Sequence, residues 1–325
     1  MKAVFLDFET LGPNDIDISE LKTHLPNLKI YGNTTAKELD THIDNAEILL
    51  VNKISLDAGS LDAASKLQLV CVSATGTDNI DLEAAKKNNI AVCNIRDYCT
   101  PSVTQHVFSM ILSLNQHLEE YRDQVRKGYW QSSKNFCLLT PTIRELKGKK
   151  IGIIGLGTLG QGVAKIAHSF GMKVIAGELS WRKNGKKPNN FKNVLRLPLS
   201  EVLEQSDILS LHCPLNEKTH HLINAETLSI MKSDALLINT ARGKLIDNKA
   251  LLEKLSRNEI GGAGIDVLDE EPPIKGNILI DAKLNNLILT PHIAWSSREA
   301  RQRAVNEMLL NILSFLDGGK RNRLV

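Results

Sequence analysis

The sequence has few of the features that mark disulfide-bonded, zinc-binding or membrane proteins. Its five cysteines are odd in number and form no CxxC pair, so we expect neither a disulfide framework nor a zinc site, and we predict no metal. No apolar run approaches the roughly 18 residues of a membrane-spanning helix. Asp7 and Glu9 stand where a signal peptide would need an apolar run, so we predict a cytoplasmic location.

The chain also has little excess of one charge over the other. The formal net charge is only +3 and both signs are mixed along the chain, which argues against a nucleic-acid partner. The hydrophobic content of 42% and the charged content of 24% are typical of globular proteins. A chain of 325 residues exceeds the size at which a single core keeps growing, so we expect two domains.

Short apolar runs alternate with helical patterns along the chain, which predicts an α/β protein with parallel sheets. Strands are expected at 3–6, 29–31, 47–51, 69–73, 91–93, 151–154, 173–176, 208–211, 235–239, 263–267 and 287–289. Helices are expected at 18–24, 35–43, 60–65, 82–87, 102–118 and 297–315. Residues 116–146 are more polar and irregular. We expect the first domain to comprise 1–100 and 297–325, with a second domain, 101–296, inserted into it.

A glycine-rich turn follows the apolar run at 151–154. Gly155, Gly157 and Gly160 match the GxGxxG pattern, in which the glycines allow a tight turn, a close approach to a pyrophosphate and helix-to-strand packing. Gly171 is placed to end the helix that follows. Glu178 comes about 20 residues after the turn, where an acid that binds the ribose hydroxyls is expected. The pattern therefore predicts a dinucleotide site.

Three polar residues follow later apolar runs. Arg242, Glu271 and His292 each lie just beyond a predicted strand, at the edge of the sheet that borders the ligand crevice. Taken alone, each is more often a surface ion pair or a bystander. Together they supply a donor fork for a carboxylate, a proton that moves near neutral pH, and an acceptor that orients the imidazole. This combination is suited to reducing a keto acid.

The first domain offers weaker candidates for substrate contact. Gly76 lies in the turn after the strand at 69–73, where backbone N–H groups of Thr75 and Gly76 can approach an anion, although a plain strand-to-helix turn is the more common interpretation. Asn52 and Lys53 also end a strand on the same edge.

These motifs resemble those of the D-isomer-specific 2-hydroxyacid dehydrogenases, and within that family the branch of glycerate dehydrogenases, or hydroxypyruvate reductases. The resemblance covers nearly the whole chain. The segments that carry it are Ala74 to Asp81, Ser102 to His106, the glycine motif, Leu211 to Leu215, Ile238 to Gly243, Asp266 to Pro273 and Pro291 to Trp295.

The resemblance implies a Rossmann NAD-binding domain inserted into a flavodoxin-like substrate domain, both doubly wound parallel sheets. It implies that Arg242 binds and polarises the substrate, that His292 is the general acid/base, and that Glu271, rather than the neighbouring Glu270, hydrogen-bonds His292. The amides of Thr75 and Gly76 would hold the substrate carboxylate. The implied cofactor contacts are Thr104, Gly155, Gly157, Thr158, Leu159, Gly160, Glu178, His212, Cys213, Pro214, Thr240, Ala241, Asp266, His292 and Ala294. The counterpart of 116–146 takes part in dimer contacts in the family, so a homodimer is expected.

The expected activity is hydride transfer between NADH and hydroxypyruvate or glyoxylate, giving D-glycerate or glycolate. Asn52, Lys53 and Trp295 are candidates for the side-chain pocket. NADP is the less expected cofactor, although Arg182, Lys183, Lys186 and Lys187 follow Glu178 and are able to attract a 2′-phosphate. Another D-2-hydroxyacid dehydrogenase, of the D-lactate type, and an NAD-sensing binding protein remain the alternatives.

Overall fold

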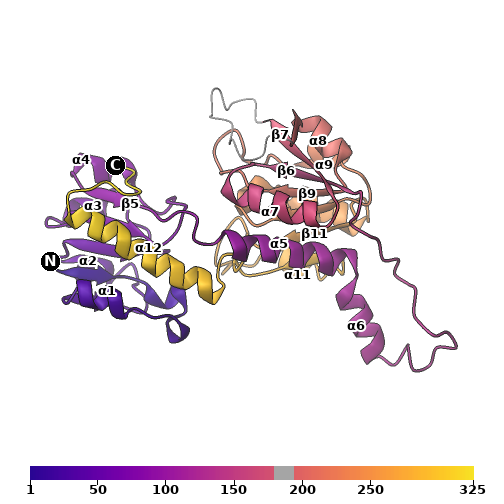
Figure 1. The fold of residues 1–325 in the computed structure, drawn as a ribbon, viewed down its shortest axis with the longest axis horizontal. Helices are drawn as coiled ribbons and strands as arrows, with labels where there is room; N and C mark the ends of the chain where they lie inside the picture. Colours follow the sequence, from indigo (N-terminus) through magenta and orange to yellow (C-terminus); the bar gives the residue numbers. More distant parts are fainter. Residues whose placement is uncertain (179–193) are drawn as a thin grey trace. The chain divides into compact units, whose positions relative to one another are not determined.

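A computed structural model describes residues 1–178 and 194–325 of the chain (Figure 1). The chain divides into two compact units. Unit 1 consists of Met1–Cys99 and Trp295–Val325, and unit 2 of Thr100–Ala294. The basic residues Arg182, Lys183, Lys186 and Lys187 lie outside the described residues.

Unit 1 contains a parallel sheet with the strand order β2-β1-β3-β4-β5. The strands are β1 (Ala3–Phe5), β2 (Leu28–Ile30), β3 (Ile48–Val51), β4 (Leu69–Val72) and β5 (Ala91–Cys93). Every residue of β3 and β4 is buried, as expected for strands covered on both faces. The order changes direction between β1 and β3, and ligands bind at such a switch point in doubly wound sheets.

Helices complete unit 1. They are α1 (Ser19–His24), α2 (Leu39–Ile43), α3 (Ala58–Ala63), α4 (Leu82–Lys87) and α12 (Arg298–Leu316), with 3₁₀ turns at Phe8–Leu11 and Pro13–Asp15. The Ser297 side chain accepts a hydrogen bond from the backbone N–H of Ala300 and caps α12. Ala304, Met308 and Ile312 recur at helical spacing and are fully buried. Through this stripe α12 packs against β4 of the unit 1 sheet. Figure 1 shows the helix lying along that sheet.

Unit 2 contains a larger parallel sheet with the order β12-β11-β10-β9-β6-β7-β8. The strands are β6 (Lys150–Ile154), β7 (Lys173–Glu178), β8 (Leu195–Pro198), β9 (Ile208–Leu211), β10 (Leu236–Asn239), β11 (Gly262–Ile265) and β12 (Leu287–Leu289). The switch point lies between β6 and β9. The carboxyl ends of these two strands therefore border the crevice in which a dinucleotide binds in such sheets.

The helices of unit 2 pack on this sheet. They are α5 (Thr100–Asn115), α6 (Leu118–Arg126), α7 (Thr158–Ser169), α8 (Leu199–Gln205), α9 (Ala225–Ile230), α10 (Asn248–Ser256) and α11 (Ile278–Asp281), with a 3₁₀ turn at Gly243–Leu245. Asp247 caps α10 by accepting hydrogen bonds from the N–H groups of Lys249 and Ala250. In the packing between α5 and α7, Phe108 and Phe170 stack with 5.3 Å between ring centroids.

The expected α/β fold with two doubly wound parallel sheets is confirmed, although several elements of unit 2, among them the helices α8, α9, α10 and α11, were not predicted. The segment 116–146, expected to be irregular, contains α6, which begins directly after His117 in a left-handed conformation. The edge strand β8 was not predicted, because its residues are only partly buried and Pro198 ends it. No helix in the described part of the chain is long and apolar enough to cross a membrane.

Candidate active site

The glycine turn after β6 has the geometry that a dinucleotide requires. Gly155 has a φ of +100°, and a Cβ there would lie 2.6 Å from the backbone nitrogen of Cys213. A Cβ on Gly160 would collide with the carbonyl oxygen of Gly155. By contrast, open space surrounds Gly157, which immediately precedes Thr158 at the start of α7. The turn thus leaves room for a phosphate at a helix N-terminus, and this part of the chain fits the predicted cofactor.

Glu178 is the last residue of β7, next to β6 in the sheet, and it is exposed. An acid at this position can accept hydrogen bonds from the ribose hydroxyls of a dinucleotide bound at the glycine turn.

Two buried polar atoms lie at the carboxyl ends of β9 and β10. Ser210 and Nε2 of His212 share a hydrogen bond of 2.8 Å, whereas Nδ1 of His212 has no protein partner in the described structure. The same holds for the hydroxyl of Thr240, just after β10. Burial lowers the pKa of His212 to about 4, so its ring is neutral near pH 7. Buried polar atoms usually have partners, so these two atoms suggest contacts with a bound molecule.

Other residues predicted to contact the cofactor have their polar groups engaged within the protein. The Thr104 hydroxyl donates to the carbonyl of Thr100 at 2.6 Å, and a Cβ on Gly162 of α7 would lie 2.7 Å from that hydroxyl. The N–H of Ala294 donates to Asp266 at 2.8 Å. Burial raises the pKa of the Cys213 thiol to about 11, so this side chain stays neutral. Contacts of these residues with the cofactor stay predictions.

Arg242 lies in a tightly fixed turn after β10. Asn239, at the end of that strand, donates from Nδ2 to the carbonyl of Arg242 at 2.8 Å. A Cβ on Gly243 would collide with the backbone of Leu268, in the segment that follows β11. Only glycine fits there, and its close approach brings the turn carrying Arg242 against the segment that leads to Glu271.

His292 and Glu271 form a direct pair. Nδ1 of His292 lies 2.6 Å from Oε2 of Glu271, and the two side chains are 27% and 33% exposed. The other carboxylate oxygen of Glu271 accepts the N–H of Leu268 at 2.7 Å. Since a carboxylate only accepts hydrogen bonds, Nδ1 of His292 carries a proton and donates it to Glu271 in the hydrogen bond. Nε2 of the ring is then left for a substrate. A partly exposed imidazole held by a carboxylate can donate and accept a proton.

Two buried carboxylates, Asp266 and Asp7, fix the backbone beside the candidate catalytic and substrate residues. The sequence analysis assigned Asp266 only as a cofactor contact and did not assign Asp7. Asp266 is buried after β11, and its carboxylate accepts the N–H groups of Ile293 and Ala294. In unit 1, buried Asp7 accepts the N–H groups of Asn52, Lys53 and Ile54 at 2.9, 2.6 and 3.1 Å. Burial raises the pKa of Asp7 even though these hydrogen bonds oppose the shift. A polar residue two positions after β1, at a switch point, was the available signal for Asp7.

The predicted substrate residues of unit 1 share one edge of its sheet. Asn52 and Lys53 follow β3, and Thr75 and Gly76 follow β4, the neighbouring strand. Asn52 is buried and donates to the Thr10 hydroxyl at 2.9 Å. Nζ of Lys53 lies 5.6 Å from the ring centroid of Trp295.

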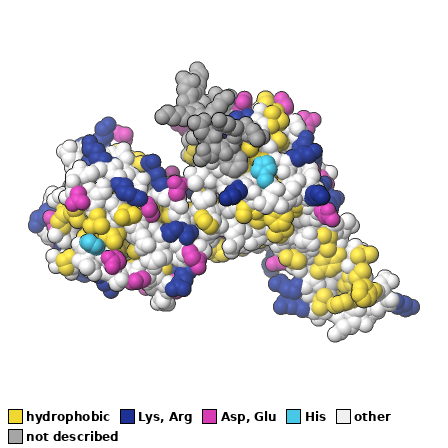
Figure 2. Space-filling view, viewed as in Figure 1, with side chains coloured by type: hydrophobic (Ala, Val, Ile, Leu, Met, Phe, Trp, Pro, Cys, Tyr) yellow, Lys and Arg dark blue, Asp and Glu magenta, His cyan; other side chains and the backbone are white. Residues whose placement is uncertain are grey.

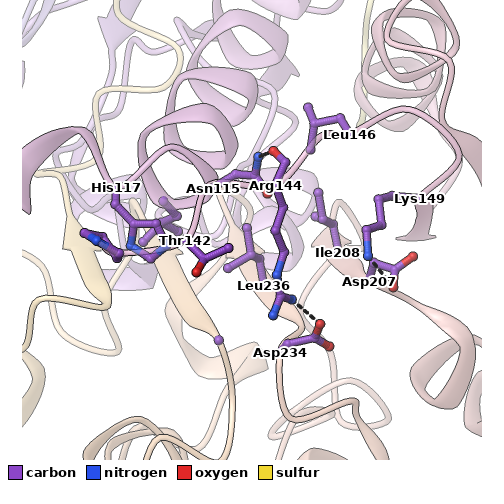
Figure 3. Close-up of a pocket in the computed structure, with 13 residues that line it drawn as sticks. Asn115, His117, Thr142, Arg144, Leu146, Lys149, Asp207, Ile208, Asp234 and Leu236 are labelled. Atoms are coloured by element: carbon purple, nitrogen blue, oxygen red, sulfur yellow. Dashed lines mark hydrogen bonds and ion pairs between the residues drawn. The ribbon is translucent and has the colours of Figure 1, made fainter. Parts of the chain in front are cut away.

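A pocket of about 280 Å³ lies at the amino ends of strands in the unit 2 sheet, at the end opposite to the predicted site (Figure 3). Asp207 lies just before β9 and pairs with Lys149, and Asp234 lies two residues before β10 and pairs with Arg144. None of the predicted catalytic, cofactor or substrate residues lines this pocket. Because the predicted site uses the carboxyl ends of the strands, this pocket is a separate feature.

Comparison with known proteins gives a consistent result. Residues 108–294 match the family model described as D-isomer specific 2-hydroxyacid dehydrogenase, NAD binding domain. The chain is 41% identical to a glycerate dehydrogenase of Methylorubrum extorquens over 323 residues, which cover 99% of this chain and 98% of the relative. It is 36% identical to a hydroxypyruvate reductase of Blautia hydrogenotrophica, with 99% of both chains covered.

A solved structure is similar over the full length of both chains. It is an acyclic imino acid reductase in complex with NADPH and D-Arg, with a TM-score of 0.87 and 32% sequence identity. The match covers 100% of each chain, so both sheets and their connections have counterparts in that structure.

Proposed function

Because the chain belongs to the D-isomer specific 2-hydroxyacid dehydrogenases, we propose that it reduces hydroxypyruvate to D-glycerate with NADH, and glyoxylate to glycolate. Family membership confirms the predicted resemblance, the dehydrogenase activity and NAD as the cofactor. The observation that carries the proposal is the 2.6 Å pair of His292 and Glu271, in the same unit as a glycine turn that fits a dinucleotide. Relatives named for glycerate and hydroxypyruvate support the substrate.

Each of the three predicted catalytic residues has a distinct role in this proposal. When bound, NADH supplies the hydride that reduces the carbonyl carbon. His292 donates the proton that the carbonyl oxygen acquires, from Nε2, and recovers it in the reverse reaction. Glu271 accepts the hydrogen bond from Nδ1, which orients the ring. Arg242 binds the substrate carboxylate and polarises the adjacent carbonyl.

The substrate residues of unit 1 have a complementary role. The amides of Thr75 and Gly76 bind the substrate carboxylate, while Asn52, Lys53 and Trp295 select the side chain. Asp7 holds the backbone of Asn52 and Lys53 in place. A pocket built to hydrogen-bond a hydroxyl rejects an analogue that lacks it, so the hydroxymethyl group of hydroxypyruvate is the preferred tail.

Glu178 is the basis for proposing that NADH is preferred over NADPH. A carboxylate accepts hydrogen bonds from the ribose hydroxyls and repels a 2′-phosphate. The similar imino acid reductase was solved with NADPH, so the fold itself does not exclude the phosphorylated cofactor. The choice therefore depends on local residues such as Glu178.

We also propose a homodimer that acts in the cytoplasm. The segment around α6 exposes large apolar side chains, among them Trp130, Phe136, Leu139 and Ile143, and Figure 2 shows hydrophobic side chains gathered on this part of the chain. Contiguous exposed apolar surface marks an interaction site.

The cysteines bear on the proposed location. The described cysteines, four of them buried, are all free thiols, which suits a reducing compartment such as the cytoplasm.

A panel of 2-keto acids tests the proposed function. Initial rates of NADH oxidation are measured with hydroxypyruvate, glyoxylate and pyruvate, and the product of the first is analysed on a chiral column. We expect kcat/KM to fall in that order, with D-glycerate as the product. Pyruvate turned over as efficiently as hydroxypyruvate would indicate a D-lactate type enzyme. Binding of NADH without turnover of any keto acid would indicate an NAD-sensing protein.

A further inference from the structure

One face of helix α5 contacts the segment that carries His292. Nε2 of His106 lies 3.0 Å from the Thr290 hydroxyl. One helical turn earlier, the Ser102 hydroxyl donates to the carbonyl of Ala294 at 2.7 Å. Because residues four apart share one face of a helix, Ser102 and His106 contact the segment on either side of His292.

The contact of His106 continues to a buried carboxylate. The Thr290 hydroxyl donates to Oδ1 of Asp266 at 2.5 Å, and the same oxygen accepts the N–H of Ile293 at 2.9 Å. A hydroxyl has a single proton, and the Thr290 hydroxyl uses it in the hydrogen bond to the Asp266 carboxylate. His106 must therefore donate from Nε2 to Thr290, which fixes the ring in a form protonated at Nε2. Asp266 is fully buried, whereas His106 is 18% exposed.

The backbone of His292 needs such support. Its φ is +56°, in the left-handed region that residues with a side chain adopt only at an energetic cost. Such a conformation persists where surrounding contacts fix it. The N–H of His292 donates to the carbonyl of Asp266 at 2.8 Å, and Asp266 also binds the next two N–H groups. The imidazole that pairs with Glu271 thus projects from a loop anchored on Asp266.

We propose that His106 and Thr290 are positioning residues for the reaction, acting through Asp266 to hold His292 against Glu271. This inference rests on the proposed function of His292. Neither residue is placed against the substrate; each fixes the loop from which the acid/base acts. Without the hydrogen bond from His106, Thr290 and the carboxylate gain freedom, and the His292 side chain spends less time in contact with Glu271.

Two matched pairs of variants test this inference. His106→Leu removes the donor, and His106→Gln restores an N–H donor on a flexible side chain. Thr290→Val removes the hydroxyl while keeping the shape, and Thr290→Ser retains it. His168→Leu, at an exposed position of α7, is the control for replacing a histidine. Thermal unfolding of each variant establishes that it is folded before rates are compared.

We expect His106→Leu and Thr290→Val to lower kcat for hydroxypyruvate by about 10-fold, the effect of losing one hydrogen bond in a charged network. The Kd of NADH should stay within about twofold of the parent value, since a tenfold effect would need about 1.4 kcal/mol of lost binding. The KM for hydroxypyruvate should also change little, because neither residue is placed against the substrate. The glutamine and serine variants should recover most of kcat.

A role in stability alone would lower the unfolding temperature and leave kcat of the folded enzyme at the parental value. A parental kcat in both His106→Leu and Thr290→Val would therefore overturn the inference. His292→Ala, measured in parallel, separates this failure from failure of the proposed function. If His292→Ala keeps its turnover, the proposed function is wrong. If it loses turnover while the other variants do not, only the positioning role is wrong.

Discussion

Replacing Glu271 by glutamine removes the negative charge beside His292 while keeping the length of the side chain. In the parent protein one carboxylate oxygen accepts the N–H of Leu268 at 2.7 Å and the other lies 2.6 Å from Nδ1 of His292. The amide oxygen of glutamine is needed for Leu268, so its NH₂ group faces Nδ1. An NH₂ donor requires a lone pair on Nδ1, and this favours the neutral ring.

The magnitude follows from the strength of the lost interaction. A hydrogen bond to a charged group contributes about 1.5–3 kcal/mol. The His292 and Glu271 side chains are 27% and 33% exposed, so the lower end of that range applies. Since about 1.4 kcal/mol corresponds to a tenfold change in rate, kcat for hydroxypyruvate reduction should fall by about 10-fold. The rate falls because the ring loses the carboxylate that accepts its hydrogen bond from Nδ1 and holds it as a proton donor.

The assay is the initial rate of NADH oxidation at saturating hydroxypyruvate and NADH. Glu270→Gln is the matched control, because it removes the same charge from the adjacent, exposed residue. Its kcat should equal that of the parent protein. Equal losses of kcat in both variants, or no loss in Glu271→Gln, would refute the assignment of Glu271 as the partner of His292.

Three further predictions concern the cofactor, stability and assembly. Glu178→Ala should narrow the preference for NADH over NADPH in kcat/KM, and equal efficiency of both cofactors in the parent protein would contradict the role of Glu178. Burial lowers the pKa of His212 from 6.5 in the unfolded chain to about 4 in the folded protein. The stability that the neutral, buried ring contributes is therefore complete above pH 6.5 and is lost as the pH falls through the folded-state pKa. Urea unfolding of the parent should therefore lose about 2 kcal/mol more than His212→Gln between about pH 7 and pH 5, and parallel losses would argue against a buried neutral ring. Phe136→Ser combined with Leu139→Ser should convert the dimer to a monomer in light scattering after size exclusion, and a parent protein that is already monomeric would contradict the proposed assembly.

The parts of the fold that were predictable depend on local signals. β3 and β4 are continuous apolar runs that are buried throughout, so the pattern alone identifies them. Gly155, Gly157 and Gly160 are spaced for a turn whose geometry requires glycine at the first and last of these positions. The helix expected at 102–118 corresponds to α5, which the structure places at Thr100–Asn115, with an apolar stripe that is buried.

The parts that were missed depend on contacts between distant residues or on weak burial. The bond from His106 to Thr290 spans 184 positions in the chain, and no periodicity reports such a contact. Asp7 likewise binds backbone groups 45 positions away. α6 has no buried residue, so it lacks the apolar stripe by which other helices are recognised. Sequence patterns therefore supplied candidate acids and bases, while the network that positions them required the fold.

The turnover of His292→Ala with hydroxypyruvate and NADH tests the central claim most directly. General acid catalysis contributes about 100-fold or more, so kcat should fall by at least that factor while the Kd of NADH changes little. The variant keeps the glycine turn and Glu178, so loss of rate with retained cofactor binding identifies the missing proton donor. A kcat near that of the parent protein would contradict the assignment of His292 and, with it, the proposed active site.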